Sequence, residues 1–188
     1  MGRKFTRVSQ EAFKEFQIEA GLILNAFDPT GETDAEDADI VCATTGGIDI
    51  TCKPNYINLF DDVDNAPSNT LEGLEVDGWD CGLGFTSLGV TAETIKLSLG
   101  IADVAGNKIT PRASVKKSDA KDIWWVGDRS DGGFVACRLM NALSADGLAL
   151  KTTKKGKGQL SCKLTGYITL DAQDVVPMEF YVQEGEAE

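Results

Sequence analysis

The sequence predicts a mainly β protein, an antiparallel β-sandwich or barrel that carries one α-helix. Two segments show the alternation of half-buried strands, in which every second side chain is apolar. In the first segment the apolar positions are Ile48, Ile50 and Cys52. In the second they are Trp79, Cys81, Leu83 and Phe85, separated by Asp80, Gly82, Gly84 and Thr86. Turn-rich stretches separate these and later apolar runs, which is typical of antiparallel sheets with one solvated face.

The chain of 188 residues is long enough for one domain with a substantial core. We expect residues 1–188 to form a single domain organised around a long hairpin at residues 40–88. The loop of this hairpin is expected at residues 54–70. An N-terminal arm is expected at residues 1–20, and a loose acidic tail at residues 183–188.

Smaller signals place the other elements. Ser9 and Glu11 favour a short capped helix or turn, and Gly46 with Gly47 favours a bulge in the first arm of the hairpin. Strands are expected outside the hairpin at residues 21–24, 122–126, 134–143, 148–152, 159–170 and 178–182, with an exposed loop at 27–39.

Residues 91–102 fit two patterns. Ile95 and Leu99 share a helical face, Thr91 is a good N-cap, and Glu93 suits a first turn. The apolar residues from Ile95 to Ile101 also alternate as in a strand. We favour a helix because of the cap, and because the next turn signal comes only at residues 105–107.

Charge is distributed unevenly over this chain of net charge −12. Between residues 28 and 93 the only base is Lys53, whereas bases dominate between residues 108 and 163. Two interpretations stay open, a solvated acidic surface that maintains solubility and a bipolar subunit whose acidic and basic parts meet in an assembly. A predominantly acidic chain is poorly suited to grip nucleic-acid phosphates.

The residue inventory argues against an enzyme and against a bound cofactor. The chain has no histidine, which removes Ser-His-Asp and Cys-His catalysis and the commonest metal ligand. Asp61 and Asp62 lie in a turn-rich loop without an aromatic sugar platform, and their spacing is not that of an EF-hand. The five cysteines form no C-x-x-C motif, so we expect buried free thiols, no disulfide framework and no metal site.

Targeting signals are also missing from the sequence. No run of about 20 apolar residues is present, so no membrane anchor is expected. The basic N-terminus is not followed by an apolar h-region before Glu11, so we expect no secretory signal and a first location in the cytoplasm.

Short motifs are distributed along nearly the whole chain: residues 43–48 (ATTGGI), 51–54 (TCKP), 61–67 (DDVDNAP), 69–70 (NT), 78–81 (GWDC), 109–112 (ITPR), 124–128 (WWVGD), 141–144 (NALS), 155–159 (KGKGQ) and 176–181 (VPMEFY). With these motifs the sequence resembles the tail-tube (major tail) proteins of tailed bacteriophages and related prophage particles. Each motif alone is a turn or a strand fragment, and their order along the chain is the order such proteins show.

The resemblance implies hexameric rings stacked into a hollow tube, in which each subunit contributes strands to a continuous inner β-barrel. It implies a virion protein assembled in the bacterial host cytoplasm, with tape-measure and tail-terminator or baseplate proteins as partners. DNA would pass through the lumen without specific binding. Whether the tube serves a flexible tail, a contractile tail or a phage-derived contractile particle stays open.

Within that implied assembly, three sets of residues receive roles. The hairpin loop would reach the neighbouring ring with Asp61, Asp62, Asp64, Asn65, Pro67 and Asn69. Candidate bases that would meet it are Lys116, Lys117, Lys154 and Lys155. The face that would line the lumen with small, acidic or neutral groups carries Asp80, Gly82, Gly84 and Thr86.

A monomeric β-sandwich that binds a carbohydrate or a protein is the alternative of a different class. Trp124 and Trp125 are adjacent on an expected strand, so one of them should point away from the core. An exposed indole commonly marks an interface. Packing of that second ring against the helix or against a neighbouring subunit is the competing expectation.

Overall fold

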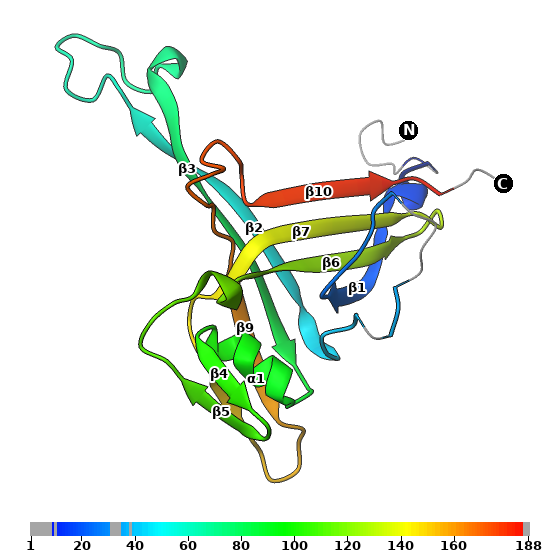
Figure 1. Cartoon of the computed structure of the whole chain (residues 1–188). Coiled ribbons are helices and arrows are strands. Elements are labelled where there is room, and N and C mark those ends of the chain that lie inside the picture. Colours follow the sequence, from blue (N-terminus) through cyan, green and yellow to red (C-terminus); the bar gives the residue numbers. More distant parts are fainter. Residues whose placement is uncertain (1–8, 10, 31–34, 38, 186–188) are drawn as a thin grey trace.

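The structure is a computed structural model that describes residues 9, 11–30, 35–37 and 39–185. It confirms the mainly β, antiparallel fold, although the sheets of one chain do not close into a barrel. The first layer contains β1 (Gln17–Leu24), β6 (Lys121–Arg129), β7 (Phe134–Ser144) and β10 (Met178–Gln183). The second contains β2 (Thr44–Asn58), β3 (Leu74–Ser87), β8 (Ala149–Lys151) and β9 (Gln159–Thr165). The two layers run across one another and are continuous where the end of β7 pairs with β9 (Figure 1).

Shorter elements complete the described chain. The predicted helix is confirmed as α1 (Ala92–Leu99), and the predicted N-terminal turn forms the 3₁₀ helix η1 (Glu11–Glu15). Two further 3₁₀ helices are η2 (Leu71–Gly73) and η3 (Lys117–Asp119), and a separate two-stranded sheet contains β4 (Ala102–Ala105) and β5 (Lys108–Pro111). Among the described residues, no helix is long and apolar enough to cross a membrane.

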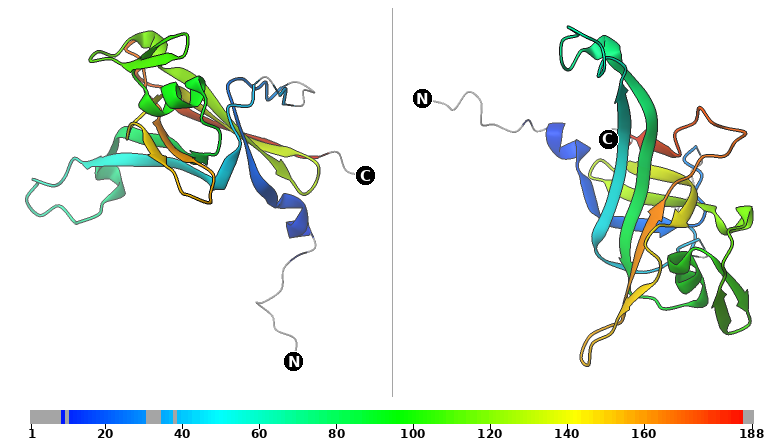
Figure 2. Two further views of the ribbon diagram at one scale, coloured as in Figure 1. Left: turned by 90° about the horizontal axis from the view of Figure 1, so that it is seen from below. Right: turned by 90° about the vertical axis from the view of Figure 1, so that its left-hand side faces the viewer.

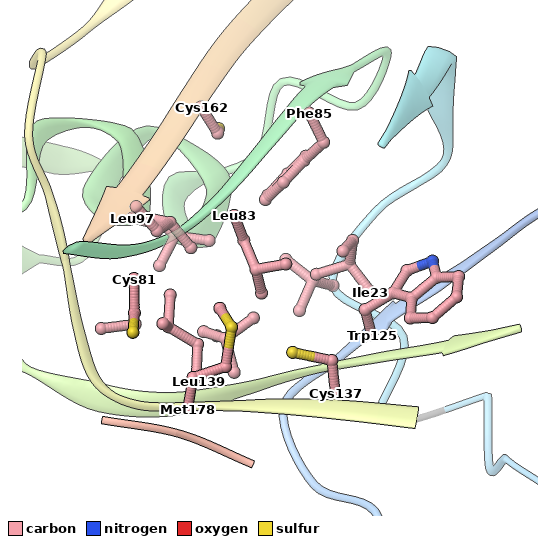
Figure 3. Packing of buried hydrophobic residues seen from close by; sticks show 14 of the residues in the cluster. Ile23, Cys81, Leu83, Phe85, Leu97, Trp125, Cys137, Leu139, Cys162 and Met178 are labelled. Atoms are coloured by element: carbon pink, nitrogen blue, oxygen red, sulfur yellow. The ribbon is translucent and has the colours of Figure 1, made fainter. Parts of the chain in front are cut away.

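The main core lies between the two layers. Figure 3 shows Cys81, Leu83 and Phe85 of β3 pointing toward Cys137 and Leu139 of β7. All five are buried, which confirms the predicted apolar face of this part of β3. The alternation therefore has a direct cause, because only the face toward the first layer is removed from water.

Trp79 departs from that prediction because it lies on β3 beyond the first layer. Its side chain is 38% exposed, although it belongs to the same alternating set as Cys81. No described strand of the first layer covers this part of the hairpin. Trp79 therefore follows the alternation of the core residues but is not buried.

The two adjacent tryptophans point to opposite faces of the first layer, as predicted, but neither forms an exposed indole, since both are only 7% exposed. Trp125 joins the main core, and its Nε1 donates to the Ala20 carbonyl at 2.9 Å. Trp124 points to the other face of the first layer and packs in a second cluster with Leu24, Ala136 and Phe27. The segment after β1 thus covers the face that sequence alternation alone leaves open.

The loop of the long hairpin lies later in the chain than predicted. β2 continues to Asn58 and so includes the start of the expected loop 54–70, whereas β3 begins only at Leu74, after η2. Ile40 makes only an isolated bridge with Leu24 and is not part of the hairpin. The predicted bulge is confirmed, since the register shifts between Thr45 and Ile48 and both intervening glycines have positive φ.

The helix begins where its cap predicts but ends earlier than residue 102. Thr91 is the N-cap, and Gly100, with a positive φ of 74°, follows Leu99. Ala102 already belongs to β4. Glycine adopts a positive φ without the steric penalty that a Cβ would bring, which is why the helix can stop there.

The ends of the expected chain segments also change. β1 begins at Gln17 rather than residue 21, so the predicted arm 1–20 includes strand residues, while residues 1–8 and 10 lie outside the described part. β9 ends at Thr165 rather than at 170. Gln183 belongs to β10 and Gly185 donates a backbone hydrogen bond to Asp131, so the acidic tail does not begin at 183; residues 186–188 are not among those described.

Candidate assembly surfaces

The β2–β3 hairpin extends as a two-stranded ribbon beyond the rest of the fold (Figures 1 and 2). Pairing of β3 with β9 covers only Gly82 to Ser87, so no third strand of the described chain supports the outer part of the ribbon. This extension exposes a set of large apolar side chains: Tyr56, Ile57, Leu59, Val63, Leu71, Leu74 and Val76. Exposed apolar residues that gather on one protruding element indicate an interaction surface.

The tip of the hairpin carries all six residues predicted for the contact between rings. Asp61, Asp62 and Asp64 are exposed, and no ion pair to them is seen among the described residues. Asn65 and Asn69 have φ values of 63° and 58°, a conformation that asparagine tolerates better than most residues. The tip is thus a series of defined turns that presents three carboxylates to solvent.

The tip is closed by its own packing. The Leu59 amide donates to the Gly73 carbonyl at 2.7 Å, and the Phe60 amide donates to Asn58 Oδ1 at 3.0 Å. A Cβ at position 73 would lie 2.7 Å from the Phe60 ring, so glycine is required for this close approach.

The basic turn between β8 and β9 lies at the opposite end of the same layer (Figure 1). Antiparallel pairing fixes this arrangement, because Leu160 at the start of β9 pairs with Ser87 at the end of β3, while the tip precedes Leu74. Lys154 and Lys155 are exposed in this turn. Exposed apolar residues accompany them on neighbouring segments: Val90, Leu148 and Leu150. Val90 and Leu150 both approach Gly158, which places them beside the basic turn.

The four candidate bases do not form one cluster. Lys116 and Lys117 lie at η3, which is separate from the β8–β9 turn in the views of Figures 1 and 2. Lys116 already contacts Asp103 at 3.3 Å. Lys154 and Lys155 therefore remain the better candidates to meet an acidic surface from outside the chain.

The predicted lumen face lies on the side of β3 that points away from the core. Cross-strand pairing extends it over three strands, with Thr51 opposite Gly82 and Thr165, and Asp49 opposite Gly84 and Lys163. Together these residues line an open hollow of about 530 Å³. A Cβ at Gly82 would lie 2.9 Å from the Leu164 carbonyl oxygen, so this glycine keeps the face flat.

This face carries more positive charge than its β3 residues suggest. Lys53 is paired in register with Asp80, and Lys163 contacts Asp146 at 3.2 Å. The expected character, small and acidic or neutral, therefore describes β3 alone. The alternation in residues 160–165 indicates that Lys163 lies on the polar face of its strand. The sequence does not reveal, however, that this strand, β9, is the neighbour of β3.

β2 is an edge strand of 15 residues. It ends the strand order of its sheet, so its second edge has no strand partner within the described part of the chain. Long unpaired edges are a template for pairing with another chain. Pro54 removes one donor from this strand, which is compatible with an edge position.

All five cysteines are free, as predicted, but only Cys81, Cys137 and Cys162 are fully buried, while Cys42 and Cys52 are half-buried. Burial raises the pKa of the Cys81 and Cys137 thiols to about 12 and that of Cys162 to about 11. Thiols with such pKa values are protonated at neutral pH and behave as small apolar groups. The described residues contain no cluster of three or more possible metal-ligating side chains.

A cavity of about 380 Å³ lies beside α1 and is lined partly by Glu93, Leu97, Val104 and Lys121. The Lys121 ammonium contacts the Glu93 carboxylate at 3.1 Å, and this hydrogen bond lowers the pKa of Glu93. Because the two charges satisfy one another, we interpret this cavity as a packing feature around a structural ion pair.

Comparisons with known proteins do not assign a family: no protein-family profile matches the chain, and no curated protein matches it.

Proposed function

We propose that this protein is a structural subunit that polymerises as stacked hexameric rings into a hollow phage tail tube. The proposal rests on the difference between the two ends of the second layer. One end presents an acidic hairpin tip with exposed apolar residues, and the other presents Lys154 and Lys155 beside Val90 and Leu150. Complementary surfaces at opposite ends favour head-to-tail, heterologous contacts, which generate rings or filaments.

The apolar residues would supply most of the free energy of the contact between rings. Exposed ion pairs contribute only about 0–1 kcal/mol each. Burial of a large apolar side chain contributes about 1.5–3 kcal/mol, and Leu71 is 78% exposed in the isolated chain. In this proposal Asp61, Asp62 and Asp64 select the orientation of the contact and Leu71 with its apolar neighbours stabilises it.

The free edge of β2 would form the contact within a ring. Pairing of this edge with a neighbouring copy satisfies its backbone donors and acceptors and extends the second layer from subunit to subunit. Closure of the extended sheet around the ring gives a barrel without exposed edges. The face with Asp80, Gly82, Gly84 and Thr86 would then line the lumen.

The proposed lumen suits passage of DNA without specific binding. Acids and bases alternate on this face, so their fields partly cancel, and the glycines leave no large side chain to obstruct the channel. The role is thus proposed to be a genome conduit in the virion tail rather than catalysis, with tape-measure and tail-terminator or baseplate proteins as partners.

Neutralising the tip tests the proposed contact between rings. We expect the combined variant Asp61→Asn, Asp62→Asn and Asp64→Asn to form fewer and shorter tubes in electron micrographs. The matched control removes the same charge elsewhere with Asp37→Asn, Asp128→Asn and Asp171→Asn, and should assemble normally. Tubes of normal length and abundance from the tip variant would contradict the role of the loop.

The monomeric binding module loses the feature that favoured it, since neither Trp124 nor Trp125 is exposed. Size-exclusion chromatography at high protein concentration separates the two functions. A sharp monomer peak without rings or filaments would favour the binding module.

A further inference from the structure

An acidic, aromatic hollow lies at the base of the hairpin, where β3 extends beyond the first layer. It has a volume of about 560 Å³ and is bounded by β3 and by the segment between β9 and β10. We name it the hairpin-base hollow and define it by Asp77, Trp79, Asp80, Tyr167 and Asp174, which are among its lining residues.

Asp80 of the hairpin-base hollow is paired in register with Lys53, so Asp77 and Asp174 are its carboxylates without a basic cross-strand partner among the described residues. The lining of the hollow contains three aspartates and no lysine or arginine. Elsewhere in the described chain, Asp103, Asp122 and Asp146 contact basic side chains at 2.9, 2.6 and 3.2 Å. No such contact is seen for the aspartates of the hollow among the described residues. Carboxylates without a counter-charge that lie beside an indole and a phenol form a favourable site for a cationic side chain. The carboxylates attract the charged group, and the aromatic rings pack against its aliphatic stem.

The chain itself contains a segment with the complementary chemistry. Its first eight residues include Arg3, Lys4 and Arg7 with Phe5 between them, and no acid occurs before Glu11. An arginine guanidinium stacks on aromatic faces and donates to carboxylates at the same time. The second basic candidate, the turn with Lys154 and Lys155, is already required at the end of the second layer.

The topology places the start of β1, which follows this segment in the chain, away from the hollow of the same copy. Gln17 at the start of β1 pairs with Arg129, and Gln183 pairs with Phe134 at the same end of the first layer. The hollow lies at the other end, next to Pro177 and the start of β10 (Figure 1). Copies placed side by side in the same orientation would therefore bring the N-terminal end of one copy toward the hollow of the next.

We propose that the basic N-terminal segment, residues 1–8, docks in the hairpin-base hollow of a neighbouring copy. The inference rests on the proposed function, because it requires that identical copies lie side by side in a ring. It adds a contact within the ring that does not depend on strand pairing. Eight extended residues span at most about 29 Å, a length that allows a neighbour to be reached while the segment follows the subunit surface.

A photo-crosslinker at position 5 of the full-length chain tests the location. Phe5 is replaced by benzoylphenylalanine, and unlabelled protein is mixed with ¹⁵N-labelled protein before irradiation. We expect mixed-label crosslinks from position 5 to residues 76–80 or 166–177. Crosslinks that fall predominantly elsewhere, or only within one chain, would overturn the proposal even if micrographs show normal tubes.

A peptide titration keeps the inference testable if no tubes form. A fluorescent peptide of residues 1–10 is titrated into the full-length protein, and its affinity is measured by anisotropy. We expect Asp77→Asn with Asp174→Asn to weaken binding at least tenfold. The control Asp61→Asn with Asp62→Asn removes equal charge from the same hairpin outside the hollow and should bind as the unmodified protein does. Equal affinity for both variants, or no binding to the unmodified protein, would overturn the inference.

Discussion

At the residue scale, Trp124 shows how an outer sheet face becomes a second core. Its ring lies 5.7 Å from that of Phe27 in an edge-on arrangement and 5.6 Å from that of Tyr181. The Arg138 guanidinium lies 5.7 Å from the centre of the Trp124 ring and is held by Asp122 at 2.6 Å. The tryptophan thus joins the first layer to the segment that follows β1.

Truncation of this ring should destabilise the protein strongly. We expect Trp124→Ala to lower the free energy of unfolding by about 3–5 kcal/mol, because it removes a buried aromatic ring and leaves a cavity. Urea unfolding measures the change. The matched control is Phe180→Ala on β10, whose side chain is 55% exposed and should cost much less. Equal losses for the two variants would contradict the burial of Trp124.

At the scale of elements, α1 illustrates a local signal that determines a structure. The Thr91 hydroxyl accepts from the Thr94 amide at 3.1 Å, and the Thr94 hydroxyl accepts from the Thr91 amide at 2.9 Å. This reciprocal pair satisfies two amides at the helix start. The alternation from Ile95 to Ile101 does not form a strand, because the cap and the glycine at position 100 define a helix between them.

Loss of the cap should cost stability without changing the fold. We expect Thr91→Ala to lower the free energy of unfolding by about 1 kcal/mol. Chemical denaturation followed by circular dichroism measures this change. Ser114→Ala, in an exposed loop, is the control and should stay within about 0.5 kcal/mol of the unmodified protein. A Thr91→Ala variant as stable as this control would show that the cap contributes nothing.

Elements with a local signal were predictable from the sequence, whereas neighbours in space were not. The glycine bulge in β2, the strands around residues 128–133 and the helix all followed from turn residues, caps and alternation. The exposure of Trp79 and the burial of Trp124 depend on which distant segment covers each position. The hairpin-base hollow forms between β3 and the segment before β10, which are about 90 residues apart in the chain. No local sequence pattern predicts that these two segments meet.

At the scale of the whole molecule, the dominant feature is direction. The long hairpin places carboxylates and exposed apolar groups at one end of the second layer, and the basic turn lies at the other. The outer edge of β2 has no strand partner among the described residues. In a single chain, the apolar and charged groups at the two ends and the backbone groups of the β2 edge stay exposed to solvent. These exposed groups favour an assembly over a monomer.

Negative-stain electron microscopy of the purified, concentrated protein shows whether the chain assembles into a tube. We predict hollow filaments of uniform width, built from stacked rings whose end views show six subunits. A preparation that contains only dispersed monomers at high concentration, without rings or filaments, would contradict it.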